Sequence, residues 1–205
     1  MAGQQDRDPQ QGQRRAHRGV SRGLARTLRP LCDADRQRWF EVRTDPAQIA
    51  FGAPAFVRPP ASPDDLLEQV VASQAAYAEL APGTLAIVDE NDRLLGDIAW
   101  RHDVPPPLRI ADIGYSVHPD SRHRGVATAA IGLMVAWLTT DPPGPAQARV
   151  QLDHSVENLA SCRTALAAGL EREGVRRGFL PLRDEHAVGG VRRHDVCLHG
   201  VAVRT

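Results

Sequence analysis

Residues 122–128, Arg-His-Arg-Gly-Val-Ala-Thr, combine two guanidinium groups and a glycine where a strand is expected to end and a helix to begin. We call this segment the basic turn. The first amides of a helix have no partner within it, and the positive end of the helix dipole lies beside them, so this junction favours an anion such as pyrophosphate. Arg122 and Arg124 can add charge and paired donors, or point into solvent. The basic turn therefore predicts a phosphate-binding site, with donors from the backbone amides of His123, Arg124, Gly125, Val126, Ala127 and Thr128.

The elements that position the basic turn follow from hydrophobic periodicity and from turn residues. Strands are expected over residues 84–88, 94–101 and 109–117, and their short connections indicate an antiparallel meander that ends at Val117. A helix with apolar residues at helical spacing follows, up to residue 138. Residues 44–61 contain Pro54, Pro59 and Pro60 and are expected to be irregular.

The remaining elements complete an α+β pattern. We expect a first strand over residues 24–29 and further strands over 148–153, 175–183 and 192–203. Helices are expected over residues 33–43 and 158–168. Another helix should begin after the Ser62 cap and end at the break at residues 82–83. This order predicts a sheet with helices on its faces.

Composition narrows the class of protein. With 205 residues and 42% hydrophobic residues, the chain suits one domain, expected over residues 24–205, behind a disordered basic tail over residues 1–23. The 25 basic and 25 acidic residues balance, so no global field recruits nucleic acid or a membrane. The tail alone could contact RNA, although a solvated extension is the simpler interpretation. The sequence contains no lysine, so the chain has no side-chain ammonium of its own to modify.

Cysteine usage and hydropathy indicate a cytoplasmic protein. Cys32, Cys162 and Cys197 are widely spaced and odd in number, which suggests neither a disulfide framework nor a Cys-x-x-Cys metal site. No apolar run approaches the length of a membrane span, and the N-terminal residues lack the apolar core of a signal peptide.

The chain resembles the GNAT acetyltransferase superfamily from about residue 24 to its end. Arg122, Gly125 and Ala127 match motif A of that family, which is Arg or Gln, two residues, Gly, one residue, and Gly or Ala. Downstream residues resemble the ordered series of the RimJ/RimL-type subgroup, which acetylates ribosomal-protein N-termini: Asn158 with Ser161, Gly169-Leu170 and Glu173-Gly174. The resemblance implies a GNAT fold, a mixed, mostly antiparallel twisted sheet of about seven strands with helices on both faces.

The resemblance also implies a ligand and a site. Acetyl-CoA would be the acetyl donor, with its pyrophosphate on the amides of the basic turn. The strand that ends at Val117 should splay away from the 148–153 strand to admit the pantetheine arm. Family pattern places Asn158 beside the cofactor and Ser161 within reach of the thioester sulfur. Asn and Ser are also common helix-cap residues, which is the alternative reading of both positions.

The implied reaction is direct attack of a neutral amine on the thioester in a ternary complex. A hydrogen bond from Ser161 would assist a leaving thiolate whose pKa is about 8.5. Asp112 lies where the family often carries an acid and is our candidate base, although it can equally be a solvent-facing strand residue. The rival bases are Asp97, Glu157 and His154.

The first expected acceptor is the α-amine of a protein or peptide. An α-amine with a pKa near 8 is neutral at pH 7 in roughly one molecule in ten, whereas a lysine amine is neutral in about one in 2,500. Because a neutral amine is needed for attack, a weak base suits the α-amine better. We expect the protein to be a monomer or a homodimer, with no membrane partner.

Two alternatives stay open, and departures from the family pattern keep the second of them open. His123 replaces the first glycine of the usual run, Leu170 replaces Phe, Ala129 stands where an acid is frequent, and His199 takes a common aromatic position. The alternatives are an acetyltransferase for a small-molecule amine, such as an antibiotic or a polyamine, and a non-catalytic acyl-CoA-binding regulatory module.

Overall fold

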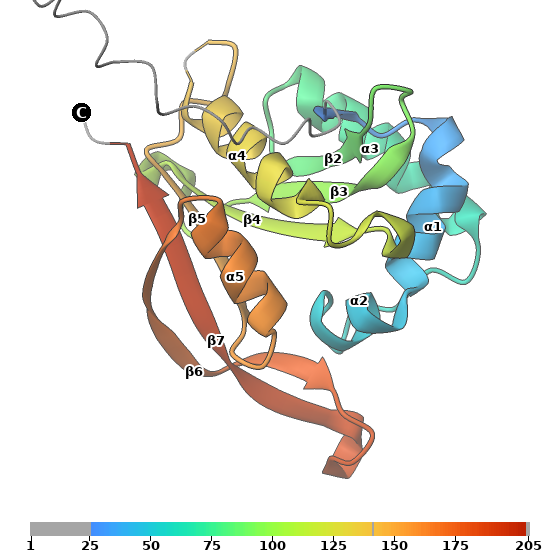
Figure 1. Cartoon of the computed structure of the whole chain (residues 1–205), viewed down its shortest axis with the longest axis vertical. Helices are drawn as coiled ribbons and strands as arrows, with labels where there is room; N and C mark the ends of the chain where they lie inside the picture. The colour runs from blue at the N-terminus through green and yellow to red at the C-terminus, as the bar shows by residue number, and fades with distance from the viewer. Residues whose placement is uncertain (1–25, 141, 204–205) are drawn as a thin grey trace, which may run out of the picture.

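The computed structural model describes residues 26–140 and 142–203. The expected basic tail and the start of the expected first strand, at residues 24 and 25, lie outside the described residues. One seven-stranded sheet carries the strand order β1-β2-β3-β4-β5-β7-β6 (Figure 1). Its strands are β1 (Thr27–Pro30), β2 (Gly83–Val88), β3 (Leu94–Arg101), β4 (Ile110–Val117), β5 (Arg149–Ser155), β6 (Glu171–Arg183) and β7 (Val191–Ala202).

Five α-helices accompany this sheet in the described part of the chain. They are α1 (Arg36–Thr44), α2 (Pro46–Phe51), α3 (Leu67–Ala78), α4 (Val126–Thr139) and α5 (Leu159–Ala167). Within the same residues, no helix is both long and apolar enough to cross a membrane. The expected α+β architecture, with about seven strands, is confirmed.

The sheet is antiparallel at every pairing except one. Strands β1 to β4 form the expected meander, and β5, β7 and β6 pair antiparallel on the other side. Between these two groups β4 and β5 run parallel, and only residues 110–112 pair with residues 149–151. Beyond those three pairs the strands part, so residues 113–117 and 152–155 face each other across a gap. The splay that the resemblance implied is present.

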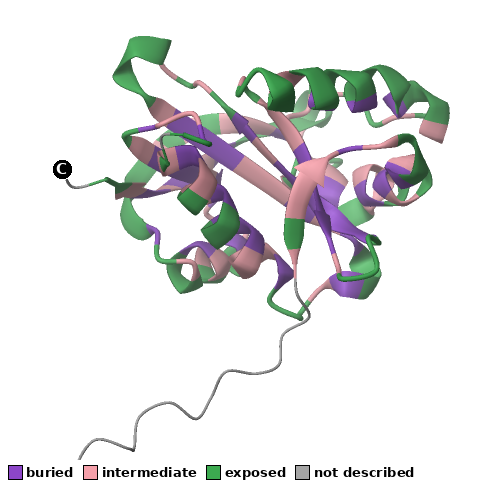
Figure 2. Ribbon diagram, turned by 90° about the horizontal axis from the view of Figure 1, so that it is seen from above, coloured by how far each residue is buried: buried purple, intermediate pink, exposed green. Residues whose placement is uncertain are grey.

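Two apolar cores hold the sheet from opposite faces. Alternate residues of β2 divide between them: Leu85 and Ile87 join the core under α4 and α5, whereas Ala86 and Val88 join the core under α1 and α3. Because side chains alternate along a strand, this division places helices on both faces. Figure 2 shows the burial that results, with buried strands in the middle and exposed residues on the outer sides of the helices.

One expectation is wrong: residues 44–61 are not irregular throughout, because α2 forms at residues 46–51. A side-chain oxygen of Asp45 accepts hydrogen bonds from the amides of Ala47 at 3.1 Å and Gln48 at 3.2 Å, which caps the helix. Pro46 occupies the first helical position, where its missing N–H costs nothing. The prolines that argued against a helix all follow α2.

Other boundaries differ by a few residues. Strand β6 begins at Glu171 rather than at residue 175, because its pairing with β7 continues past a register shift between Arg172 and Gly174. A 3-10 turn, Pro63–Leu66, precedes α3.

Candidate active site

The parting of β4 and β5 opens a cleft of about 680 Å³. Its walls are the unpaired ends of both strands, the basic turn with the first residues of α4, the start of α5, and the segment from α2 to Pro54. Parallel strands present their carboxyl ends at the same edge of a sheet, so the helices that follow β4 and β5 both begin at this cleft. The site therefore gathers residues from distant parts of the chain.

The basic turn presents free backbone amides to the cleft. The first hydrogen bond of α4 runs from the Ala129 amide to the Gly125 carbonyl, and no side chain caps the helix. The amides at the helix start thus keep their donors available for an anion. Gly125 has φ 69° and His123 has φ 60°, both in the left-handed region. Histidine tolerates this region better than most residues do, so it can stand where the family carries glycine.

Most of the residues expected to bind the donor line the cleft. They are Val117, Arg122, His123, Gly125, Val126, Ala127, Thr128 and Asn158. Arg124 does not line the cleft; it is exposed, and its carbonyl accepts a hydrogen bond from Arg26.

The Arg122 side chain joins two walls of the cleft. Its Nε donates to the Val117 carbonyl at 3.2 Å, and its Nη2 donates to Asp45, the carboxylate that caps α2. The guanidinium group is therefore engaged with the protein rather than pointing into solvent. Asp45 therefore pairs with the basic turn and caps α2 with the same carboxylate.

The start of α5 brings two hydroxyl groups together. Asn158 is the helix cap, because its Oδ1 accepts from the Ser161 amide at 3.1 Å, and it also lines the cleft. The Ser161 side chain is buried and borders the cleft, and its Oγ accepts a hydrogen bond from Tyr115 Oη at 3.1 Å. The Ser161 proton is thus free to donate into the cleft. The sequence resemblance includes Gly114-Tyr115 but gave Tyr115 no role in the site. Period-two alternation back from Val117 would have placed Tyr115 on the same face of β4 as Val117.

Asp112 lies behind the cleft wall rather than on it. Its side chain is 1% exposed, Arg101 pairs with its Oδ2, and its Oδ1 has no hydrogen-bond partner among the described residues. Burial raises the pKa of Asp112 to about 7, and Arg101 only partly offsets that rise. Arg101, which sequence reasoning did not single out, does line the cleft. Asp112 is not the solvent-facing strand residue of the alternative interpretation.

The three rival bases are placed differently. Asp97 is fully buried and accepts the Trp39 indole N–H at 2.9 Å on the α1 side of the sheet. Glu157 pairs with Arg192 at 2.8 Å and does not line the cleft. Only His154 borders the cleft, and its Nδ1 lies 2.8 Å from the Ser155 carbonyl.

The cleft fits an amide-rich phosphorylated ligand such as CoA. Free helix amides suit the pyrophosphate, and the unpaired edges of β4 and β5 offer backbone donors and acceptors to the pantetheine amides. An ion or a cofactor of other chemistry is not needed to account for these groups.

Comparison with known proteins shows the same architecture. A family model, the acetyltransferase (GNAT) domain, matches residues 26–171. The ribosomal-protein-S5-alanine acetyltransferase from Vibrio fischeri superposes with a TM-score of 0.71 at 14% identity, over 86% of this chain and 92% of that chain. No curated protein matches the chain.

Two further structures hold CoA species. Mycobacterium smegmatis RimJ in complex with CoA-disulfide gives a TM-score of 0.69 at 20% identity, over 86% of this chain and 81% of that chain. The Vibrio cholerae spermidine N-acetyltransferase in complex with CoA and spermine gives 0.68 at 18% identity, over 86% of this chain and 95% of that chain. At these identities the likeness concerns the fold, and the two acceptors that the names give, an alanine of ribosomal protein S5 and spermidine, differ.

Substitution of Gly125 tests the basic turn as the anion site. A Cβ at this position meets no atom within 4 Å, but the φ of 69° is unfavourable for any other residue, so Gly125→Ala measures backbone strain alone. Gly125→Glu adds a carboxylate beside the free amides. We expect acetyl-CoA affinity, measured by calorimetry, to fall about tenfold or more between the Ala and Glu variants, because like charges repel. Equal affinities for the two variants would place the anion elsewhere.

Proposed function

The chain belongs to the GNAT acetyltransferase family, and we propose that it acetylates the α-amine of a protein or peptide N-terminus, as the RimJ/RimL-type subgroup does. Acetyl-CoA is the acetyl donor. The choice of an α-amine as the acceptor depends on the charge of the cleft and on the groups that can receive a proton there.

The observation that carries this proposal is the scarcity of carboxylates in the cleft. Among the described residues that line it, Asp153 is the one carboxylate, and Arg176 lies 3.5 Å from it. Arg101, Arg122 and Arg163 line the same cleft. A polyamine carries several positive charges and needs several acidic partners, whereas a peptide presents one amine. The excess of arginine thus favours an acceptor with a single amine.

The acceptor wall suits the start of a polypeptide. We use this name for the part of the cleft formed by α2 with its last residue Phe51, by the residues that follow up to Pro54, and by Leu180 of β6. The Ala55 amide donates to the Pro181 carbonyl at 2.8 Å, which joins this segment to β6. These apolar groups offer contact to the first side chains of a peptide, while the cleft stays open toward solvent.

The donor side would be held by the residues that the family pattern identifies. We assign the pyrophosphate to the amides of residues 123–128, with Arg122 and Arg124 adding positive charge nearby. Val117 and Asn158 would contact the pantetheine arm. The free amides at the start of α4 and the unpaired edge of β4 support this assignment.

The chemistry requires a proton acceptor and a donor to the leaving thiolate. We assign the acceptor to Asp112, reached from the cleft past Arg101, because a carboxyl buried beside the site titrates near the working pH. We assign the donor to Ser161, oriented by the hydrogen bond from Tyr115. A neutral hydroxyl suffices, because a thiolate is a good leaving group that needs only a hydrogen bond.

Acceptor preference tests the proposed function directly. The measurement is thiol release from acetyl-CoA with four acceptors: a peptide with a free N-terminus, the same peptide with a blocked N-terminus and one lysine, spermidine, and an aminoglycoside. We expect kcat/KM for the free peptide to exceed that for spermidine at least tenfold, with mass spectrometry placing the acetyl group on the α-amine. Release with only the small amines would assign the protein to metabolite acetylation. No release above the blank with any acceptor would contradict the peptide assignment and favour a binding module.

Removing the Ser161 hydroxyl tests the thiolate donor. We expect Ser161→Ala to lower kcat by about tenfold to a hundredfold while the KM for acetyl-CoA changes little, because the hydrogen bond strengthens as the thiolate forms. Tyr115→Phe should lower kcat less, and the double variant should be no slower than Ser161→Ala, because the two hydroxyls act as one unit. Cys162→Ala, next along α5, is the matched control. An unchanged kcat in Ser161→Ala would remove this residue from the chemistry.

Asp112→Asn tests the proton acceptor through pH dependence. Since the folded-state pKa of Asp112 is raised from 3.8 to about 7, the folded chain holds this proton more tightly than the unfolded chain. Its contribution to stability is greatest below about pH 4 and is lost as the pH rises to about 7. Urea unfolding should therefore show wild type losing stability relative to the variant across that range.

The kinetic readout separates a proton acceptor from a structural role. The ratio of wild-type to variant kcat/KM should rise as the pH increases through about 7 and reach about a hundredfold. The titration of the α-amine cancels in this ratio, because both proteins use the same acceptor. A ratio independent of pH would leave Asp112 a structural residue only.

A further inference from the structure

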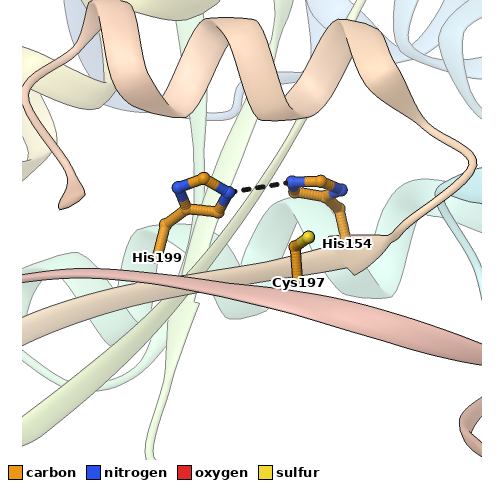
Figure 3. A group of neighbouring side chains, drawn as sticks. All are labelled: His154, Cys197 and His199. Atoms are coloured by element: carbon orange, nitrogen blue, oxygen red, sulfur yellow. Dashed lines mark hydrogen bonds between the residues drawn. The ribbon is translucent and has the colours of Figure 1, made fainter. Parts of the chain in front are cut away.

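Two histidines and a cysteine meet on one face of the neighbouring strands β5 and β7. His154 lies opposite Cys197 in the strand register, and His199 lies opposite Leu152, so the three side chains share the α5 side of the sheet. All three are buried, with exposures of 5%, 4% and 0% in the order His154, Cys197 and His199. Figure 3 shows the two rings facing each other, with the Cys197 sulfur beside His154.

The spacing of the donor atoms matches the ligands of a single ion. One ligand atom from each residue lies within 4.8 Å of the others, and the two Nε2 atoms are 3.2 Å apart. Tetrahedral zinc with Zn–N bonds of 2.0–2.1 Å separates two nitrogens by about 3.3 Å, and with a Zn–S bond of 2.3 Å it separates nitrogen from sulfur by about 3.6 Å. The rings already have the required separation, and the sulfur needs a shift of at most about 1.2 Å.

Hydrogen bonding around the cluster favours a metal ligand. His154 Nδ1 lies 2.8 Å from the Ser155 carbonyl oxygen, and at this distance Nδ1 must carry a proton and donate it. In a neutral ring Nε2 then has a free lone pair, which points toward His199. Without an ion, His199 Nε2 must donate to that lone pair. His199 Nδ1 is buried and has no hydrogen-bond partner in the described part of the chain. An ion bound to the two Nε2 atoms moves the His199 proton to Nδ1, so both rings then offer Nε2 lone pairs that face the metal.

We propose that His154, Cys197 and His199 bind one Zn²⁺ ion that ties β5 to β7 beside the acetyl-CoA cleft. A thiolate and two imidazoles are the donor set that a borderline-soft cation prefers. Binding releases the Cys197 thiol proton to solvent and gives a complex of net charge +1. Asp153 lies near enough to His154, and Glu173 near enough to His199, to offset that charge, while the positive charge of Arg172 acts on both rings. His154 borders the cleft, which gives the ion a path of entry, and three protein ligands leave one coordination position of tetrahedral zinc for a water or another ligand.

Cobalt substitution of the full-length chain tests this site. Chelator-treated protein titrated with Co²⁺ should develop thiolate-to-metal absorption at a stoichiometry of one, and Zn²⁺ should displace it. Cys197→Ala and His199→Phe, which keeps a ring but removes the ligand nitrogens, should each weaken metal affinity by about a hundredfold or more, while Cys162→Ala retains wild-type affinity. Free Zn²⁺ at a hundred times its Kd should raise the Tm of wild type by about 5–10 °C and leave the Cys197→Ala value unchanged.

A second measurement needs no variant. Zn²⁺ should protect Cys197 of the wild-type chain from a thiol reagent under mild denaturant, with the modified cysteine identified by peptide mapping, while the modification of Cys32 and Cys162 continues. Absence of thiolate absorption, zinc stabilisation that persists in Cys197→Ala, or modification of Cys197 at the same rate with and without Zn²⁺ would each overturn the proposal and leave a hydrogen-bonded pair of histidines.

Discussion

The parting of one parallel strand pair is the constraint on which the rest of the structure depends. In an otherwise antiparallel sheet, β4 and β5 share only three pairs before they separate. Because they are parallel, their carboxyl ends reach the same edge, and the turns that follow them deliver α4 and α5 to the same opening. The early separation of these two strands thus creates the cleft and leaves the backbone edges that line it unpaired. It also brings the start of α4 and Ser161 to the same cleft.

Packing beneath the basic turn keeps its unusual backbone in place. Val126, the first residue of α4, is buried at 3% exposure in the core formed with Ile131 and Met134. A left-handed conformation costs a residue other than glycine about 1–2 kcal/mol, and His123 adopts one. The apolar residues immediately downstream stabilise the helix start, so the strain at His123 is tolerated where the donor amides must converge.

Local signals in the sequence predicted the elements well and the pairings between distant residues poorly. The meander and the start of α4 follow from alternation and from glycine chemistry within a few residues. Helix α2 was missed because three prolines outweighed the Asp45-Pro46 cap. The hydrogen bond between Tyr115 and Ser161 and the cluster around His154 depend on strand register and helix placement, which join residues far apart in the chain. Burial raises the pKa of Asp112, and burial depends on the whole fold rather than on the neighbouring residues in the sequence.

Asp45 joins two walls of the cleft. The same carboxylate caps α2 on one wall and pairs with Arg122 of the basic turn on the other. Free-energy changes add only for residues that share no partner, so substitutions on the two walls will not behave as independent perturbations. For two ligands bound on these walls, the factor by which the first changes the dissociation constant of the second equals the factor by which the second changes that of the first.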